Sequence, residues 1–177
     1  IFAEDPTVHT FSIHNKDLGQ VTAIASTSVA LGAEVEDKTY LDAVREHLPP
    51  VMVACRPGLV FYLAGSDPCV DDKLGNWRIT PEGMAQRDRL VLGLLRPEQA
   101  PVPTVILLAG GYGPAAWRHG AALFSWLLAG ETHLDIPLEM ELPVDHYRRL
   151  ARHMKHPGLL PREETPAATA VEDWGLT

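Results

Sequence analysis

The chain has 177 residues, of which 46% are apolar and 21% charged, a composition typical of a single soluble globular domain. No apolar run approaches the about 20 residues that a membrane-spanning helix needs. A net charge of −8, with no Lys/Arg cluster that offers a phosphate-binding face, argues against direct nucleic-acid binding. The two cysteines do not form a disulfide framework, so we expect a reducing, cytoplasmic location.

The first third of the chain predicts one strand and one helix. The strand covers residues 8–14, with β-branched or aromatic side chains at alternate positions. A long Ser/Thr-rich loop follows, and loops of this length are commonly functional. The helix begins at Asp37, carries Leu41, Val44 and Leu48 at helical spacing, and is predicted to end before Pro49 and Pro50.

The middle of the chain predicts two buried strands around a helix. The strands cover residues 59–65 and 104–111, and their continuous apolar runs are typical of strands covered on both faces. Between them, Thr80 is the predicted N-cap of a helix whose first position is Pro81. Its inner face is predicted to consist of Met84, Val91 and Leu95.

The last third predicts two more helices and a linker. A helix over 115–129 ends at Gly130, and a further helix covers 143–156. Residues 157–177 are rich in Pro, Ala and Glu and are predicted to be a surface loop or linker. The buried face of the helix over 115–129 is predicted to consist of Trp117, Ala121, Phe124 and Leu128.

Alternating strands and helices predict an α/β fold with a mainly parallel sheet, which binds ligands outside the carboxyl ends of its strands. Asp67 follows one strand, and Tyr112 follows the next, after Gly110 and Gly111. A carboxylate suits a divalent metal, and a phenol suits hydrogen bonding to an oxyanion. An Asp before a Pro is also a common turn former, and Gly-Gly-Tyr a common tight turn. The residues alone leave both readings open.

Three segments resemble the zinc-dependent histone deacetylase superfamily, in its bacterial or class IV-like form. They are "VHTFSIH", "YLAGSDPCVDDKLGNWRITPEGMAQRDRLV" and "LLAGGYG", in the family's order and approximate spacing. The resemblance implies a three-layer α/β sandwich of the arginase/deacetylase type. It implies that residues 1–156 form the C-terminal part of a catalytic domain, incomplete by itself. Residues 157–177 would lead to a missing C-terminal segment.

The same resemblance implies roles for individual residues. Asp67 matches the carboxylate ligand of zinc, and Tyr112 the tyrosine that stabilises the oxyanion. Gly110 and Gly111 match glycines that line the acyl-binding tunnel, and Asp72 matches an aspartate that holds the loop. Two monovalent-cation sites, for K⁺, are implied by further matches: Ser12 with the carbonyl of Ile13, and the carbonyls of Phe2, Asp5 and Val8.

The implied activity is zinc-dependent hydrolysis of an acylated amine, such as acetyl-lysine or an acetylpolyamine, with release of acetate. The family's "D-x-D-x-H" strand and histidine pair do not appear in the sequence, so we expect the chain to be inactive alone. One alternative is a catalytically dead deacetylase-like binding module. The other is an arginase-like ureohydrolase, which would need several more aspartates for paired manganese ions. We interpret Cys69 as a small apolar loop residue, and His119 as a capping or packing residue.

Overall fold

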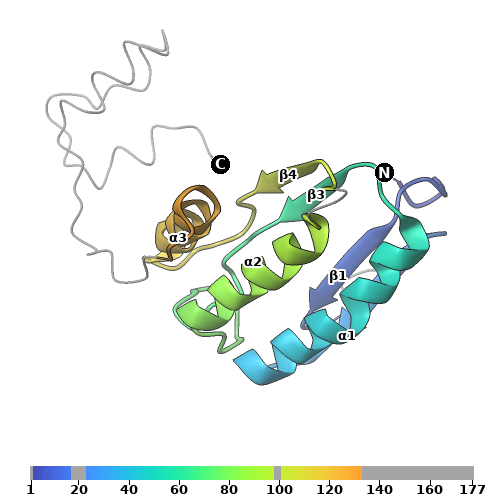
Figure 1. Cartoon of the computed structure of the whole chain (residues 1–177). Coiled ribbons are helices and arrows are strands. Elements are labelled where there is room, and N and C mark those ends of the chain that lie inside the picture. The colour runs from blue at the N-terminus through green and yellow to red at the C-terminus, as the bar shows by residue number, and fades with distance from the viewer. Residues whose placement is uncertain (1, 17–22, 98–100, 133–177) are drawn as a thin grey trace, which may run out of the picture. The chain divides into compact units, whose positions relative to one another are not determined.

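The computed structural model describes residues 2–16, 23–97 and 101–132, which belong to one compact unit, Ile1–Ile136. The helix predicted over 143–156 and the predicted boundary before residue 157 lie outside the described residues. Among the described helices, none is long and apolar enough to span a membrane. The described elements are β1 (Thr10–His14), β2 (Ser26–Ala30), α1 (Asp37–Cys55), β3 (Val60–Leu63), α2 (Pro81–Leu95), β4 (Thr104–Leu107) and α3 (Ala116–Ala129) (Figure 1).

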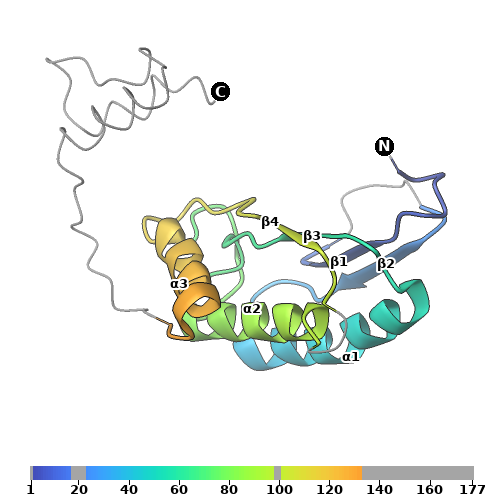
Figure 2. The same cartoon turned by 45° about the horizontal axis from the view of Figure 1, so that its top comes forward.

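The strands form two parallel pairs, β1 with β2 and β3 with β4. Helices α1 and α2 run along one side of these strands (Figure 2). The predicted α/β class with parallel strands is therefore confirmed.

Strand β2 corrects the prediction of a continuous loop between β1 and α1. It pairs with β1 in register, Phe11 opposite Thr27 and Ile13 opposite Val29. Ser26 and Ser28 alternate with these partly buried residues and point to the exposed side. The serines made the segment look like a loop, although alternation of this kind is what a half-buried strand requires.

Helix α1 continues through Pro49 and Pro50 to Cys55, so the predicted end before the prolines is wrong. Each proline removes an intrahelical hydrogen bond and costs about 3 kcal/mol in a helix interior. Burial on both sides of the pair offsets this cost: Leu48 is buried, and Met52 packs against both hydrophobic clusters. Tertiary packing therefore overrides the local stop signal.

The predicted start of α2 is confirmed. The Thr80 hydroxyl accepts a hydrogen bond from Gly83 N (3.0 Å), and Pro81 is the first helical residue. The Asp37 carboxylate, at the start of α1, accepts hydrogen bonds from Thr80 N (2.7 Å) and the Thr80 hydroxyl (2.6 Å). The two helices are therefore linked at their N-termini. Met84 and Leu95 are buried as predicted, and Leu92 joins them.

Two clusters form the hydrophobic core. The first lies between α1, α2 and the loop after β3. In it, the ring centroids of Tyr40 and Trp77 are 5.4 Å apart. The second lies under β3 and β4 and joins Ala64, Leu92, Leu95 and Leu123. The buried members of the first cluster are Val35, Tyr40, Val44, Leu48, Cys69, Trp77, Ile79 and Met84.

The predicted buried face of α3 is wrong. Trp117 and Phe124 are about two-fifths exposed and Leu128 is 87% exposed, whereas His119, Ala122 and Leu123 are buried. This helix has apolar residues over most of its circumference, so periodicity alone does not select one face. Contact with α2 selects the face that carries Leu123.

Strands β3 and β4 are covered on one face only within the described residues, which corrects the prediction of two covered faces. Val60, Tyr62 and Ile106 pack against the second cluster. The opposite face carries exposed apolar side chains, namely Phe61, Leu63, Val105 and Leu107.

Candidate functional site

The loops that follow β3 and β4 lie side by side at the carboxyl ends of the two strands. Leu63 pairs with Leu107, Ala64 N donates to Leu107 O (2.7 Å), and Ser66 N donates to Gly110 O (2.6 Å). The loop that bears Asp67 is therefore bonded to the Gly-Gly-Tyr loop. The prediction that the two loops share one edge of a sheet is confirmed.

The Asp67 carboxylate lies over glycines of both loops. A Cβ placed on Gly110 would come within 2.9 Å of Asp67 Oδ1, so only a glycine leaves room for this carboxylate. Asp67 is exposed, and within the described residues its carboxylate has no hydrogen-bond donor or cationic partner. The reading of Asp67 as a turn former that accepts backbone N–H groups is therefore not supported.

Asp72, five residues further on, is the aspartate that holds the loop. Its carboxylate accepts hydrogen bonds from Leu74 N (2.8 Å), Gly75 N (2.8 Å) and Tyr112 N (2.6 Å). Partial burial acts to raise the pKa of Asp72, but the backbone N–H donors outweigh it and hold this pKa below its usual value. The role predicted for Asp72 is confirmed, and the bond to Tyr112 N extends it to the second loop.

The Gly-Gly-Tyr loop follows β4 closely. A Cβ on Gly111 would lie 2.2 Å from Ser66 Oγ, so this position requires glycine. The Tyr112 side chain is 55% exposed at the edge that Asp67 occupies. Metal binding by Asp67, catalysis by Tyr112 and substrate binding by Gly110 and Gly111 stay predictions.

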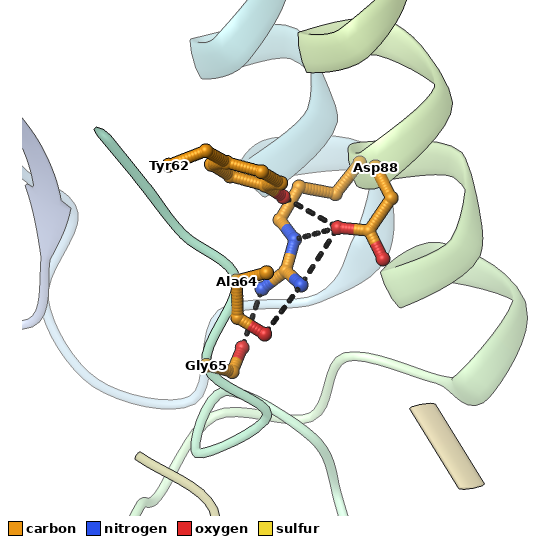
Figure 3. A network of polar contacts seen from close by, with 5 residues as sticks. Tyr62, Ala64, Gly65 and Asp88 are labelled. Atoms are coloured by element: carbon orange, nitrogen blue, oxygen red, sulfur yellow. Dashed lines mark hydrogen bonds and ion pairs between the residues drawn. The ribbon is translucent and has the colours of Figure 1, made fainter. Parts of the chain in front are cut away.

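A buried ionic network lies directly behind this edge (Figure 3). The Arg87 guanidinium donates to Gly65 O (2.6 Å) and Ala64 O (3.3 Å). These two carbonyls follow the end of β3 and precede the loop with Asp67. Arg87 also pairs with Asp88 (2.8 Å), which accepts a hydrogen bond from the Tyr62 hydroxyl. Burial, reinforced by Asp88 and opposed by the Arg87 charge, raises the pKa of Tyr62, so this phenol stays protonated and donates.

Sequence reasoning noted the Arg-Asp pair only as part of a family motif. The helical spacing could have predicted that the pair is buried. Arg87 lies three residues after Met84, and Asp88 four residues before Leu92, so both belong to the inner face of α2. Both side chains are 5% exposed. A charged pair at core positions of a helix needs partners of fixed geometry, and here the carbonyls of Ala64 and Gly65 supply them.

A second group of metal-type side chains lies behind the Asp67 loop, and sequence reasoning did not join its members. Ligand atoms of Cys69, Asp71 and His119 all lie within 4.8 Å of one another, with His119 Nε2 4.0 Å from Asp71 Oδ1. Cys69 and His119 are buried, which agrees with the apolar and packing roles predicted for them. Burial raises the pKa of Cys69 to about 11 and lowers that of His119. Two segments distant in sequence meet here, the loop that carries Cys69 and Asp71 and helix α3 with His119, so no local spacing could have shown the whole group.

The residues assigned to monovalent-cation sites lie at the start of the chain and along β1. Ser12 Oγ lies 2.9 Å from His14 Nδ1, and Ile13 lies within the parallel ladder of β1 and β2. The carbonyls of Phe2 and Asp5 accept backbone hydrogen bonds from Asp5 N (3.2 Å) and Val8 N (3.3 Å). The two cation sites, including the carbonyl of Val8, stay predictions.

Fold and edge together define an α/β protein whose ligand-binding candidates lie at the carboxyl ends of parallel strands. The family model of the histone deacetylase domain matches residues 1–128. The chain belongs to the histone deacetylase family.

Individual relatives agree with this assignment. An uncharacterized protein of Picosynechococcus sp. is 37% identical over 113 residues, which cover 63% of this chain and 37% of the relative. Histone deacetylase 2 of Arabidopsis thaliana is 30% identical over 119 residues (65% and 30%), and histone deacetylase B of Dictyostelium discoideum is 29% identical over 122 residues (69% and 26%). The crystal structure of the HDA15 HD domain matches the fold with a TM-score of 0.58 at 23% identity, covering 74% of this chain and 40% of that one.

The chain thus spans about a third of the length of these curated relatives. The described residues correspond to part of a deacetylase domain.

Proposed function

We propose that this chain supplies one side of the active site of a zinc-dependent deacetylase, which hydrolyses an acylated amine and releases acetate. The observation that carries the proposal is the Asp67 carboxylate, exposed and unpartnered among the described residues, over Gly110 at the carboxyl ends of β3 and β4. Membership of the histone deacetylase family supports the reaction class.

Asp67 fits zinc as one ligand. Catalytic zinc takes three protein ligands and keeps one open position. Within the described residues, Asp67 belongs to no group of three metal-type side chains, so the other two ligands and a general base would have to come from elsewhere. Bound zinc would polarise the acyl carbonyl and lower the pKa of a bound water.

Residues of this chain would orient the acyl group and stabilise the oxyanion. Tyr112 would donate its phenolic hydrogen bond to the oxyanion that forms when water attacks the acyl carbon. Asp72 would keep Tyr112 in position, because its carboxylate accepts the Tyr112 backbone N–H (2.6 Å). The glycine backbone of the second loop would lie against the acyl group without a side chain in the way.

The test compares the 177-residue chain with the protein encoded by the complete gene, using an acetyl-lysine peptide, an acetylpolyamine and zinc analysis. We expect no turnover from the chain alone and zinc-dependent turnover from the complete protein. Tyr112→Phe should lower turnover about 10²–10³-fold, and Asp67→Asn should remove zinc and activity together.

Two matched controls complete the test. One of them is Asp42→Asn, which should leave turnover and zinc content unchanged, since Asp42 lies on the exposed side of α1 and pairs with Lys38 and Arg45. The other is Tyr40→Phe, which should leave turnover unchanged, since Tyr40 lies in the first hydrophobic cluster against Trp77. A complete protein that binds no zinc and hydrolyses neither substrate would refute the proposal. That result would favour the alternative of a catalytically dead binding module.

A further inference from the structure

The group formed by Cys69, Asp71 and His119 combines three donor types that suit one transition-metal ion. Thiolate and imidazole donors favour Zn²⁺ and similar ions, and a carboxylate completes a three-ligand set. The three ligand atoms lie within 4.8 Å of one another. Bound tetrahedrally, they would lie about 3.3–3.7 Å apart, so closure around an ion needs only a small movement.

An orphaned ring nitrogen provides the independent observation. His119 Nε2 is fully buried and has no hydrogen-bond partner among the described residues, while the His119 side chain is only 6% exposed. Its nearest acidic atom, Asp71 Oδ1, is 4.0 Å away, beyond hydrogen-bonding distance. Buried polar atoms without a partner are rare because each costs about 1–3 kcal/mol, so His119 Nε2 is a candidate for binding an ion.

The surrounding backbone holds these side chains in place. Cys69 lies in a parallel bridge with Ile79, supported by the bonds from Val70 N to Ile79 O (2.9 Å) and from Ile79 N to Pro68 O (3.3 Å). His119 lies in the first turns of α3, three residues after Ala116. The Asp71 side chain is 34% exposed and offers an ion a route from solvent.

We propose that Cys69, Asp71 and His119 form a structural site for a transition-metal ion, with zinc as the preferred ion. The ion accepts lone pairs from Cys69 Sγ, an Asp71 carboxylate oxygen and His119 Nε2, and a water occupies the fourth position. Cys69 releases its thiol proton to solvent on binding. The ion joins the loop that carries Asp67 to helix α3, which follows the loop that carries Tyr112.

Cobalt titration of the 177-residue chain tests the site directly, because Co²⁺ bound to a thiolate gives a near-ultraviolet charge-transfer band. The chain has two cysteines, and Cys55 is exposed while Cys69 is buried. We expect the band in the wild type and in Cys55→Ser, and its loss in Cys69→Ser. Absence of the band in the wild type, or its retention in Cys69→Ser, would overturn the proposal.

Asp67→Asn separates this site from the proposed catalytic one. We expect the cobalt band to be unchanged in this variant, since Asp67 is not a member of the group. A band that disappears with Asp67→Asn would place the ion at the catalytic loop instead. The outcome does not depend on deacetylase activity, so either proposal can fail alone.

Two further variants keep the test valid if Cys69→Ser does not fold. Asp71→Asn changes a partly exposed side chain and should weaken Co²⁺ binding at least about tenfold. Saturating Zn²⁺ should raise the thermal midpoint of the wild type by about 5 °C or more and that of His119→Gln hardly at all. Equal increases in both proteins would mean that zinc binds elsewhere and would refute the site.

Discussion

The two parallel strand pairs differ in the chemistry of their exposed faces and in one buried ionic network on the covered side. The exposed face of β1–β2 carries hydroxyls, with Thr10 Oγ1 donating to Ser26 Oγ (3.1 Å), whereas the exposed face of β3–β4 carries apolar side chains such as Phe61 and Leu63. On the covered side, Phe11 and Ile13 of β1 pack against a purely hydrophobic cluster. Strand β3 packs against the second hydrophobic cluster and, through the Tyr62 hydroxyl, also contacts the buried Arg87–Asp88 pair.

This difference places the buried Arg87–Asp88 pair at the strand that leads into the loop with Asp67. The Arg87 guanidinium binds the carbonyls of Ala64 and Gly65, immediately before Asp67. The β1–β2 pair bears no comparable network among the described residues. Strands flanked by a candidate site thus receive polar anchoring in addition to hydrophobic burial.

Removal of the buried guanidinium gives the largest expected effect and tests the anchoring directly. Arg87→Ala would leave the buried Asp88 carboxylate without its cationic partner and would remove the guanidinium donor from two carbonyls, so we expect a loss of about 3–5 kcal/mol in the free energy of unfolding, measured with urea. Arg89→Ala is the matched control on the same helix, where the side chain is 39% exposed, and should cost less than about 1 kcal/mol. Similar losses in both variants would contradict the anchoring role.

The covered side of β3–β4 also depends on the face that α3 turns toward it. Leu123 is 4% exposed and belongs to the second cluster, so Leu123→Ala should cost about 2–5 kcal/mol. Leu128 is 87% exposed on the same helix, and Leu128→Ala should change the free energy of unfolding by less than about 0.5 kcal/mol. A larger loss of unfolding free energy from Leu128→Ala would mean that α3 buries the face predicted from periodicity.

A smaller effect is expected where the two loops are joined. Asp72→Asn weakens three hydrogen bonds from backbone N–H groups and should cost about 1–2 kcal/mol at pH 7. The folded-state pKa of Asp72 lies below its unfolded value of 3.8. Its contribution is therefore complete above that value and disappears as pH falls through the lower folded-state pKa.

Urea unfolding of wild type and Asp72→Asn between pH 7 and pH 2 measures this difference, which should shrink only below about pH 4. Asp42→Asn on α1 should have little effect across the same range. A wild-type advantage that persists at pH 2 would rule out the ionised carboxylate as its source.

Substitutions on the exposed faces of the two strand pairs should change the hydrophobicity of the surface and hardly change the free energy of unfolding. Phe61 is 60% exposed, so Phe61→Thr should change the free energy of unfolding by less than about 0.5 kcal/mol and reduce the binding of a hydrophobic dye. Thr10→Val, on the face of β1–β2, should increase dye binding instead. Unchanged dye fluorescence in Phe61→Thr would mean that the apolar face of β3–β4 does not bind it.

Local signals predicted much of the fold and part of the site. The caps at Thr80 and Gly130 agree with the structure, and so does the loop-holding role of Asp72, which the family resemblance implied. The errors have physical reasons: the serines of β2 resembled a loop, the prolines of α1 resembled a stop, and α3 offers more than one apolar face. In each case packing between distant segments decided the outcome.

By itself, the sequence determined the alternation of strands and helices and the two loops that carry Asp67 and Tyr112, because strand runs, caps and glycines act over a few residues. Only the tertiary structure decided that Arg87 holds the carbonyls before Asp67 and that Cys69, Asp71 and His119 meet. Arg87 lies 22 and 23 positions from the residues whose carbonyls it binds, and His119 belongs to a different element from the loop that carries Cys69 and Asp71. No local pattern encodes contacts of this kind, because only the folded chain creates them.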